Sequence, residues 1–351
     1  MAELKGNKYG THRVIEPKGV LTQAAWKIDN DMSKVYSNEI VCDVISLNVD
    51  SASFTQISEA CGGDEKKKIG EMILGIVAER GKQQNPVTGS GGMFIGTVAH
   101  IGEDLLKKPG FDLKVGDKIA SLVSLSMTPL RIDKIKAIHK DIDRVDIEGK
   151  AILFESALYA KLPDDMSEPL ALAALDVAGA PAQARKLPKE GDSVLILGAN
   201  GKSAVLCGYE AMKKVGPNGK VVGVVRKASQ VPALQELGVY TDVVVADCTK
   251  PVEVMEAALA ANGGKEYDIS ICCVNIESCE MSAILPVRDD GLVYFFSMAT
   301  SFTKAALGAE GIGKDVTMIV GNGYTKNHAE ITLNVLRENP KLRKLFDEKY
   351  C

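Results

Sequence analysis

One stretch, from Ser193 to Lys227, restricts the possible folds of this chain more than any other. It begins with the apolar run Ser193–Leu197, passes through a turn of sequence Gly-Ala-Asn-Gly-Lys-Ser, and ends in a second apolar run, Lys220–Val225. The residues between them place small or apolar side chains on one helical face, namely Ala204, Cys207, Gly208, Ala211, Met212 and Val215. This order of strand, turn, helix and strand predicts a βαβ unit that binds a dinucleotide at the turn.

The turn has the spacing GxxGxxA, because Asn200 stands where the more common GxGxxG pattern has its middle glycine. Gly198 allows a tight exit from the strand, and Gly201 lets backbone N–H groups approach a pyrophosphate at the helix N-terminus. Asn tolerates positive φ, so the turn can form with Asn200. The predicted cofactor contacts here are Gly198, Asn200, Gly201, Lys202 and Ser203. A strand-turn-helix unit without a ligand is the plainer alternative, whereas a P-loop is excluded because Ile196 replaces its first glycine.

The end of the second strand bears on which dinucleotide binds. Val225 is followed by Arg226 and Lys227, with no acidic residue near them in the sequence. An acidic residue there would bind the ribose 2′-hydroxyl of NAD, whereas an Arg accommodates the 2′-phosphate of NADP. The sequence therefore favours NADP over NAD, although an exposed Arg-Lys pair is also common in loops.

The composition is that of an ordinary globular protein with two domains. The chain has 351 residues and a net charge of −4, which disfavours nucleic acid as a partner. It contains no apolar run long enough to span a membrane, and its first residues lack a signal-peptide core, so we expect a cytoplasmic protein. The eight cysteines show no disulfide or CxxC spacing, and the four histidines show no metal-ligand spacing, so no metal site is predicted.

The organisation changes near residue 165. Residues 1–165 are expected to form a β-rich domain, and residues 166–325 a doubly wound parallel sheet. The expected strands of that sheet are Ser193–Leu197, Lys220–Val225, Val243–Val245, Ile269–Cys273, Gly291–Phe296 and Val316–Val320. Residues 326–351 read as a helical segment that packs back on the first domain.

With both halves placed, the chain resembles the medium-chain dehydrogenase/reductase superfamily. The resemblance lies in the nucleotide unit and in two β-rich segments, Phe94–Gly102 and Leu113–Ile119. It implies a Rossmann domain beside a GroES-like catalytic domain, and a homodimer formed by edge strands near Gly291–Phe296. The superfamily's zinc ligands fall at Asn48, Gly92 and Asp176, so the resemblance implies a zinc-free member.

The chain also resembles a narrower family, the amine dehydrogenases that act on 3,5-diaminohexanoate in anaerobic lysine fermentation. The likeness is carried by Lys161–Asp165, Leu195–Ser203 and Gly321–Lys326. It implies that hydride leaves C3 of a diamino acid, after which water adds and ammonia departs to give a 3-oxo acid. That family is usually described with NAD.

Such a reaction needs a base and a carboxylate that binds an ammonium group. Asp176 is one candidate, because it interrupts an apolar run where a carboxylate is costly unless paired. Asp50 is the second, with Asn48 as a substrate-binding residue; either aspartate could instead cap a helix or bond a nearby backbone amide.

Further cofactor contacts are expected where the fourth and fifth nucleotide strands end, at Val274, Asn275 and Ser297. The residue that binds the substrate carboxylate is left open among Arg131, Lys161 and Lys326. Two other functions are compatible with the sequence, a zinc-free NADPH-dependent quinone or enone reductase and a non-catalytic NADP-binding protein.

Overall fold

The computed structural model describes residues 4–62, 65–297, 299–321 and 323–351. Asn322, which belongs to the Gly321–Lys326 motif, lies outside these residues. The chain divides into two compact units, Met1–Asp164 and Asp165–Cys351. Each unit has its own hydrophobic core.

The second unit is built on a six-stranded sheet in which every pair of neighbouring strands is parallel. Its strands are β9 (Ser193–Leu197), β10 (Lys220–Val225), β11 (Asp242–Val245), β12 (Tyr267–Cys272), β13 (Val287–Phe295) and β14 (Val316–Val320). They lie in the order β11-β10-β9-β12-β13-β14, which is the strand order of a dinucleotide-binding Rossmann fold. The fold class predicted from the sequence is confirmed.

One expectation about this sheet was wrong. Gly291–Phe296 was expected to lie at an edge of the sheet, but β13 pairs on one side with β12 and on the other with β14. The backbone groups of β13 are therefore already hydrogen-bonded on both sides, and β13 cannot add a strand from a second copy of the chain.

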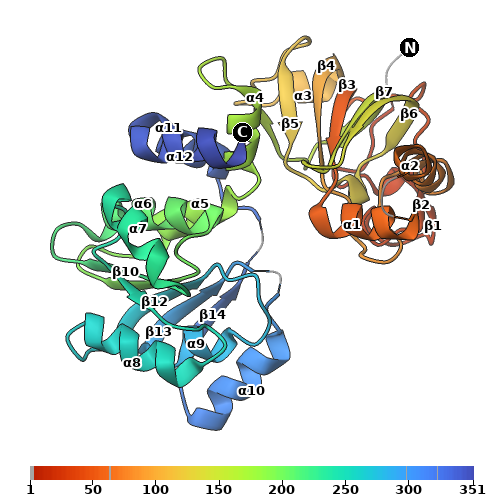
Figure 1. Cartoon of the computed structure of the whole chain (residues 1–351). Coiled ribbons are helices and arrows are strands. Elements are labelled where there is room, and N and C mark those ends of the chain that lie inside the picture. Colours follow the sequence, from red (N-terminus) through yellow and green to blue (C-terminus); the bar gives the residue numbers. More distant parts are fainter. Residues whose placement is uncertain (1–3, 63–64, 298, 322) are drawn as a thin grey trace. The chain divides into compact units, whose positions relative to one another are not determined.

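Helices cover both faces of the parallel sheet (Figure 1). α5 (Gly179–Lys186) and α6 (Lys202–Val215) lie on one face, and α8 (Pro251–Ala261), α9 (Glu280–Ile284) and α10 (Phe302–Ile312) lie on the other. Apolar residues of α8, α9 and α10 share one core cluster with the strands. The remaining helices are α4 (Glu168–Leu175), α7 (Val231–Leu237), α11 (His328–Glu338), α12 (Pro340–Tyr350) and the short 3-10 turn η3 (Ala228–Gln230).

The last two helices belong to the second unit, whereas residues 326–351 were expected to be a separate segment that packs on the first domain. Their apolar faces explain the difference, because α11 packs against α4, α5 and α6, and α12 packs against α4. Pro340 begins α12, and Asn339 caps it by accepting from the N–H groups of Lys341 at 3.0 Å and Leu342 at 3.1 Å. Arg337 of α11 forms two hydrogen bonds to the carboxylate of Asp165, at 2.9 and 3.2 Å.

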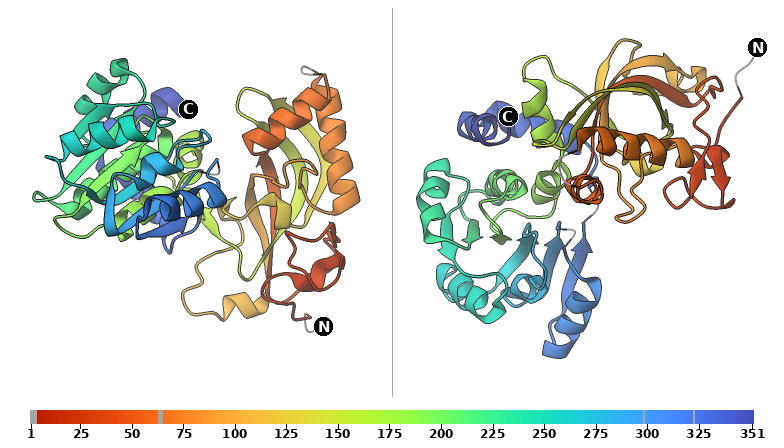
Figure 2. Two further views of the ribbon diagram at one scale, coloured as in Figure 1. Left: turned by 90° about the horizontal axis from the view of Figure 1, so that it is seen from below. Right: turned by 45° about the vertical axis from the view of Figure 1, so that its right-hand side comes forward.

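The first unit contains a six-stranded antiparallel sheet in the order β6-β7-β3-β4-β5-β8. Helices α1 and α2 lie along it in Figure 2, and their apolar faces join the core. The elements are η1 (Thr11–Arg13), β1 (Val14–Glu16), β2 (Lys27–Ile28), β3 (Glu39–Asn48), α1 (Ser51–Ala60), α2 (Lys66–Arg80), β4 (Met93–Ile101), α3 (Glu103–Leu106), β5 (Lys118–Ser121), η2 (Leu125–Met127), β6 (Leu130–His139), β7 (Arg144–Phe154) and β8 (Tyr159–Lys161). Within the described parts of the chain, every helix is too short or too polar to span a bilayer.

A buried lysine follows α2. The Lys82 side chain is 0% exposed, and its Nζ donates to the carbonyl oxygens of Thr22 at 2.6 Å and Gln23 at 3.2 Å. Burial, together with the positive charge of Arg80, lowers the pKa of Lys82 from 10.5 to about 7. The unfolded chain therefore binds one more proton than the folded chain between these two pH values.

This lysine predicts a pH dependence of stability. Because the folded pKa lies below the unfolded one, stability rises with pH from about 7 to about 10.5, by at most about 1.4 kcal/mol per pH unit. In Lys82→Met this contribution is absent. Denaturant unfolding of both proteins at several pH values tests it, and equal pH slopes for the two proteins would contradict the assignment.

Candidate functional site

The turn after β9 approaches the end of β12 closely. Gly198 has φ +79°, in the left-handed region, and a Cβ there would lie 3.1 Å from Val274 Cγ2 and 3.3 Å from the carbonyl carbon of Cys273. The N–H of Gly201 then donates to the carbonyl of Gly198 at 2.8 Å, which closes the turn. Asn200 does not use the left-handed region, so its replacement of a glycine requires no unusual backbone conformation.

Helix α6 begins directly after this turn, with Gly201 as its N-cap residue. No side chain caps the helix, and no acidic residue lies in its first turn. The N–H groups of its first residues therefore have no intrahelical partner, and the helix dipole adds partial positive charge. This is the geometry that binds a phosphate group.

A cavity of about 480 Å³ opens at this turn. It lies where β9 and β12 adjoin, the point at which strand order reverses and α/β sheets bind ligands. Its lining residues are Gly198, Asn200, Gly201, Val224, Val225, Arg226, Gln230, Asp247, Cys248, Thr249, Cys273, Val274, Asn275, Ile276, Lys349 and Tyr350. Six of the predicted cofactor contacts are among them, whereas Lys202, Ser203, Lys227 and Ser297 are not.

The polar end of the cavity contains both a cation and an anion. Arg226 follows β10, and Asp247 follows β11, the neighbouring strand. Hydrogen bonds from the backbone N–H and the hydroxyl of Thr249 lower the pKa of Asp247, and the charges of Arg226 and Lys250 act in the same direction. Sequence reasoning found no acidic residue near Arg226 because Asp247 is brought there only by the pairing of the two strands.

The predicted contacts at the fourth and fifth strands lie together. Ser297 Oγ is 3.5 Å from Asn275 Oδ1 and also accepts from the N–H of Ala299 at 3.1 Å. Beside them, hydrogen bonds from Cys207 and Ser203 lower the pKa of the Cys273 thiol. Ser203 and Ser297 do not line the cavity themselves. Each is hydrogen-bonded to a residue that does, Ser203 to Cys273 and Ser297 to Asn275.

Asp176 is the C-cap residue of α4, and its carboxylate forms an ion pair with Lys202, the first residue of α6. The side chain of Asp176 is 57% exposed, so its carboxylate is both solvated and paired. The structure therefore brings one proposed catalytic carboxylate to one proposed cofactor residue. Asp50 belongs to the other unit.

Asn48 and Asp50 lie where β3 ends in the first unit. Asp50 caps α1, with its Oδ1 accepting from the N–H of Ser53 at 3.0 Å, as the plainer interpretation of this residue had it. Its other oxygen, Oδ2, and the Asn48 Oδ1 are buried and find no hydrogen-bond partner among the described residues. Two acceptors two residues apart are thus unsatisfied, which is costly unless a ligand or water donates to them.

A third buried side chain of this kind was not identified from the sequence. Both amide atoms of Gln83 lack a partner among the described residues, and the residue is 0% exposed. A Cβ on Gly91 would lie 2.4 Å from the Gln83 carbonyl oxygen, and one on the adjacent Gly92 would lie 2.0 Å from that of Asn48. The backbones of Gln83 and Asn48 therefore adjoin the same pair of glycines. Gln83 belongs to no recognisable sequence motif, so nothing in the sequence singles it out.

The residues at the superfamily's zinc positions do not suit a metal. Gly92 has φ +93° and no room for a Cβ beside Asn48, so a histidine would not fit there. In the described ranges, no group of three or more His, Cys, Asp or Glu side chains could hold a metal ion.

Two of the three candidates for the substrate carboxylate are already paired. Arg131 bonds Asp133 at 2.9 Å, and Lys161 forms an ion pair with Asp117 at 2.9 Å. Lys326 is exposed in the second unit.

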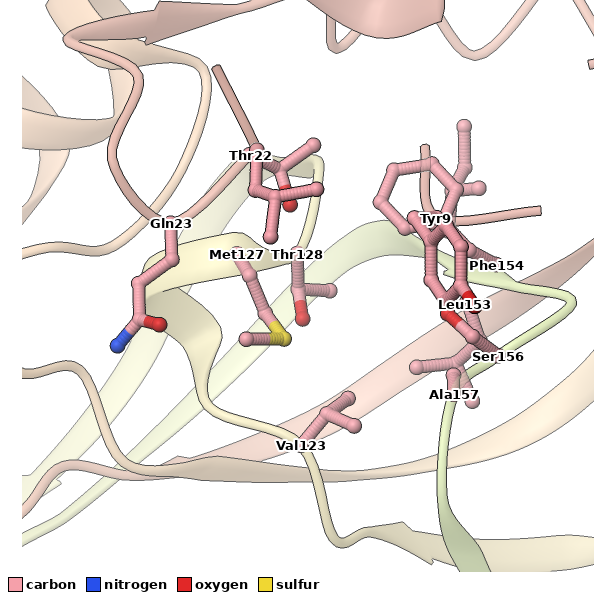
Figure 3. A pocket seen from close by; sticks show the side chains of 12 residues that line it. Tyr9, Thr22, Gln23, Val123, Met127, Thr128, Leu153, Phe154, Ser156 and Ala157 are labelled. Carbon is pink, nitrogen blue, oxygen red and sulfur yellow. The ribbon is translucent and has the colours of Figure 1, made fainter. Parts of the chain in front are cut away.

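The first unit has a cavity of its own, of about 130 Å³ (Figure 3). Its walls are largely apolar and include Val123, Met127, Leu153 and Phe154. None of the residues predicted from the sequence lines it.

The fold is shared with solved reductases. The enoyl reductase CurK superposes with a TM-score of 0.50 at 17% identity, covering 89% of this chain and 78% of that one. A quinone oxidoreductase from Pseudomonas syringae gives a TM-score of 0.50 at 16% identity, covering 90% of this chain and 82% of that one. Fold and cavity together define a protein of the Rossmann class, with a cavity at the point where the order of its parallel strands reverses.

The sequence comparisons are more specific. Residues 12–163 match the family described as "L-erythro-3,5-diaminohexanoate dehydrogenase N-terminal domain". The L-erythro-3,5-diaminohexanoate dehydrogenase of Acetoanaerobium sticklandii is 68% identical over 347 residues, 99% of this chain and 100% of that protein. The protein of the same name from Fusobacterium nucleatum is 64% identical over 346 residues, 99% of each chain. The chain belongs to the L-erythro-3,5-diaminohexanoate dehydrogenase family.

The turn at Gly198 predicts how dinucleotide binding can be removed. In Gly198→Ala, the new Cβ meets Val274 and the turn shifts, so the affinity for NAD(P) falls by about tenfold or more. Gly216→Ala is the matched control, since Gly216 ends the same helix with φ +67° and its nearest neighbour would be 3.8 Å away. Calorimetric titration measures both affinities, and equal affinities in the two variants would remove the turn from the site.

Proposed function

We propose that this protein catalyses the NAD(P)-dependent oxidative deamination of L-erythro-3,5-diaminohexanoate to 5-amino-3-oxohexanoate and ammonia, in lysine fermentation. The observation that carries the proposal is the identity of 68% and 64% to two dehydrogenases of that name over nearly the whole chain. The cavity at the Gly198 turn supports the cofactor half of the reaction.

The residues at this cavity fit a dinucleotide. The uncapped N-terminus of α6 would bind the pyrophosphate. The nicotinamide would lie beside the residues that follow the carboxyl ends of β12 and β13, namely Val274, Asn275 and Ser297. A bound oxidised dinucleotide would supply the hydride acceptor for C3 of the substrate. Arg226 would favour NADP by binding the 2′-phosphate of that cofactor. Asp247, which lines the same cavity, would offer its carboxylate to a ribose hydroxyl.

The substrate brings ammonium groups, and these need acceptors. We assign this role to Asp50 and Asn48, whose buried Oδ2 and Oδ1 lack partners among the described residues. An ammonium donor would satisfy both atoms, and the negative charge of Asp50 would strengthen the contact.

Hydride can leave C3 only after the C3 ammonium has lost a proton, because the nitrogen lone pair must assist its departure. We propose Asp176 as the residue that accepts this proton. Water then adds to the resulting carbon–nitrogen double bond, and ammonia leaves to give the 3-oxo acid. The ion pair of Asp176 with Lys202 holds the carboxylate beside the first turn of α6.

We propose further that no metal takes part. The zinc positions hold Asn48, Gly92 and Asp176, and Gly92 cannot be replaced by a larger residue without a clash. Activity should therefore survive dialysis against EDTA.

A single assay tests the proposed function. The purified protein is given 3,5-diaminohexanoate with NAD or NADP, and the reduced cofactor is followed at 340 nm while released ammonia is measured. One ammonia for each reduced nicotinamide is expected. Dinucleotide reduction without ammonia release, or turnover of neutral enones with NADPH but not of the diamino acid, would contradict the proposal.

Asp50→Asn separates the capping role of Asp50 from its proposed role in binding. Asn caps a helix as well as Asp, so the stability should change by less than about 0.5 kcal/mol. Loss of the charge should lower kcat/KM for the diamino acid by about 100-fold. Urea unfolding and steady-state kinetics measure the two effects. Unchanged kinetics would leave Asp50 with its capping role alone.

Arg226→Ala tests the cofactor preference. The KM for NADP should rise by about tenfold, as one cation is lost from the 2′-phosphate, while the KM for NAD stays unchanged. If the KM for NADP is also unchanged, Arg226 does not select the cofactor.

A further inference from the structure

The last helix, α12, ends at the dinucleotide cavity. Lys349 and Tyr350 are among its lining residues, although they lie about 150 residues along the chain from the glycine turn. The helix is fixed in place by Leu342 and Phe346, both fully buried. Phe346 also contacts the ring of Tyr350 edge-on, with ring centroids 5.1 Å apart. The end of the helix is thus a built part of the cavity wall.

The ring of Tyr350 has two ammonium groups near it. Lys349 Nζ lies 5.4 Å from the ring centroid, and Lys202 Nζ lies 5.6 Å from it. Both distances are within the range of a cation–π interaction. One lysine of α12 and the lysine that begins α6 thus lie near the same ring.

Two cations at one ring repel each other unless negative charge lies nearby. Asp176 supplies one carboxylate, through its ion pair with Lys202. Among the described residues no carboxylate pairs with Lys349, which lines the same cavity as Gly201, the N-cap residue of a helix without a side-chain cap or an acidic residue in its first turn. All of these features concentrate positive potential at the edge of the cavity.

We propose that Lys349 binds the pyrophosphate of the dinucleotide, and that Tyr350 is a positioning residue that holds Lys349 and Lys202 toward it. The proposal rests on the dinucleotide site described above. The pyrophosphate is common to NAD and NADP, so this contact adds affinity for both cofactors and does not select between them.

The test compares variants of the full-length protein by calorimetric titration with NAD, NADP and adenosine. Lys349→Ala should weaken the binding of NAD and NADP by the same factor, about two- to fivefold, as expected for one exposed cation. Adenosine has no phosphate and should bind the variant as it binds the wild type. Because ion pairing is screened by salt, the loss should shrink as the NaCl concentration rises.

Lys344→Ala is the matched control. Lys344 lies on the same helix, is exposed, and pairs with Glu348 at 3.7 Å. Neither residue lines the cavity, so loss of the Lys344 side chain should not affect dinucleotide binding. For Tyr350, the alanine variant should lose affinity for both dinucleotides, and Tyr350→Phe should restore it, since the ring alone faces the two ammonium groups. Thermal unfolding of each variant checks that it is folded.

Equal affinities of Lys349→Ala and wild type would overturn the proposal, and so would a loss confined to NADP, which would place Lys349 at the 2′-phosphate. These results are separable from a failure of the proposed function. If the wild type binds dinucleotides but does not deaminate the diamino acid, the function fails and this inference stands.

Discussion

The close approach of the Gly198 turn to the end of β12 is the constraint on which the site depends. Residue 198 leaves β9 with φ +79°, and a Cβ there would lie 3.1 Å from Val274 Cγ2, so glycine suits both the backbone conformation and the close approach. That approach places the uncapped first turn of α6 beside the point where strand order reverses. The phosphate-binding geometry therefore follows from backbone packing, and the side chains around it adjust charge and specificity.

Two cations near the cavity, Lys202 and Arg226, each lie close to a carboxylate. Lys202 is paired with Asp176, and Arg226 lies near Asp247, whose carboxylate is also held by Thr249. Each pair joins residues from different parts of the fold: Asp176 follows α4 and Lys202 begins α6, whereas Arg226 follows β10 and Asp247 follows β11. Such pairing limits the repulsion among cations that a site for a phosphate-rich cofactor must gather. It also means that removal of Asp176 would alter Lys202, so its effects on chemistry and on cofactor binding need to be measured separately.

The parallel sheet could be predicted from the sequence because its signals are local. Most of its strands are short apolar runs, and Gly198 marks the turn between β9 and α6 within a few residues. The contribution of Asp247, Lys349 and Tyr350 to the cavity could not be predicted, since strand pairing and helix packing bring them from distant parts of the sequence. The position of β13 inside the sheet could not be predicted either, because it depends on the pairing of β14 along the outer side of β13. For Asp50 both interpretations had a physical basis, and the structure shows the cap while leaving Oδ2 without a partner among the described residues.

The most direct measurement is a crystal structure of the protein with NAD or NADP bound. The pyrophosphate should accept hydrogen bonds from the backbone N–H groups of residues 202–204, with the nicotinamide at the ends of β12 and β13. A dinucleotide whose phosphates lie elsewhere, with the first turn of α6 bound only to solvent, would contradict the central claim.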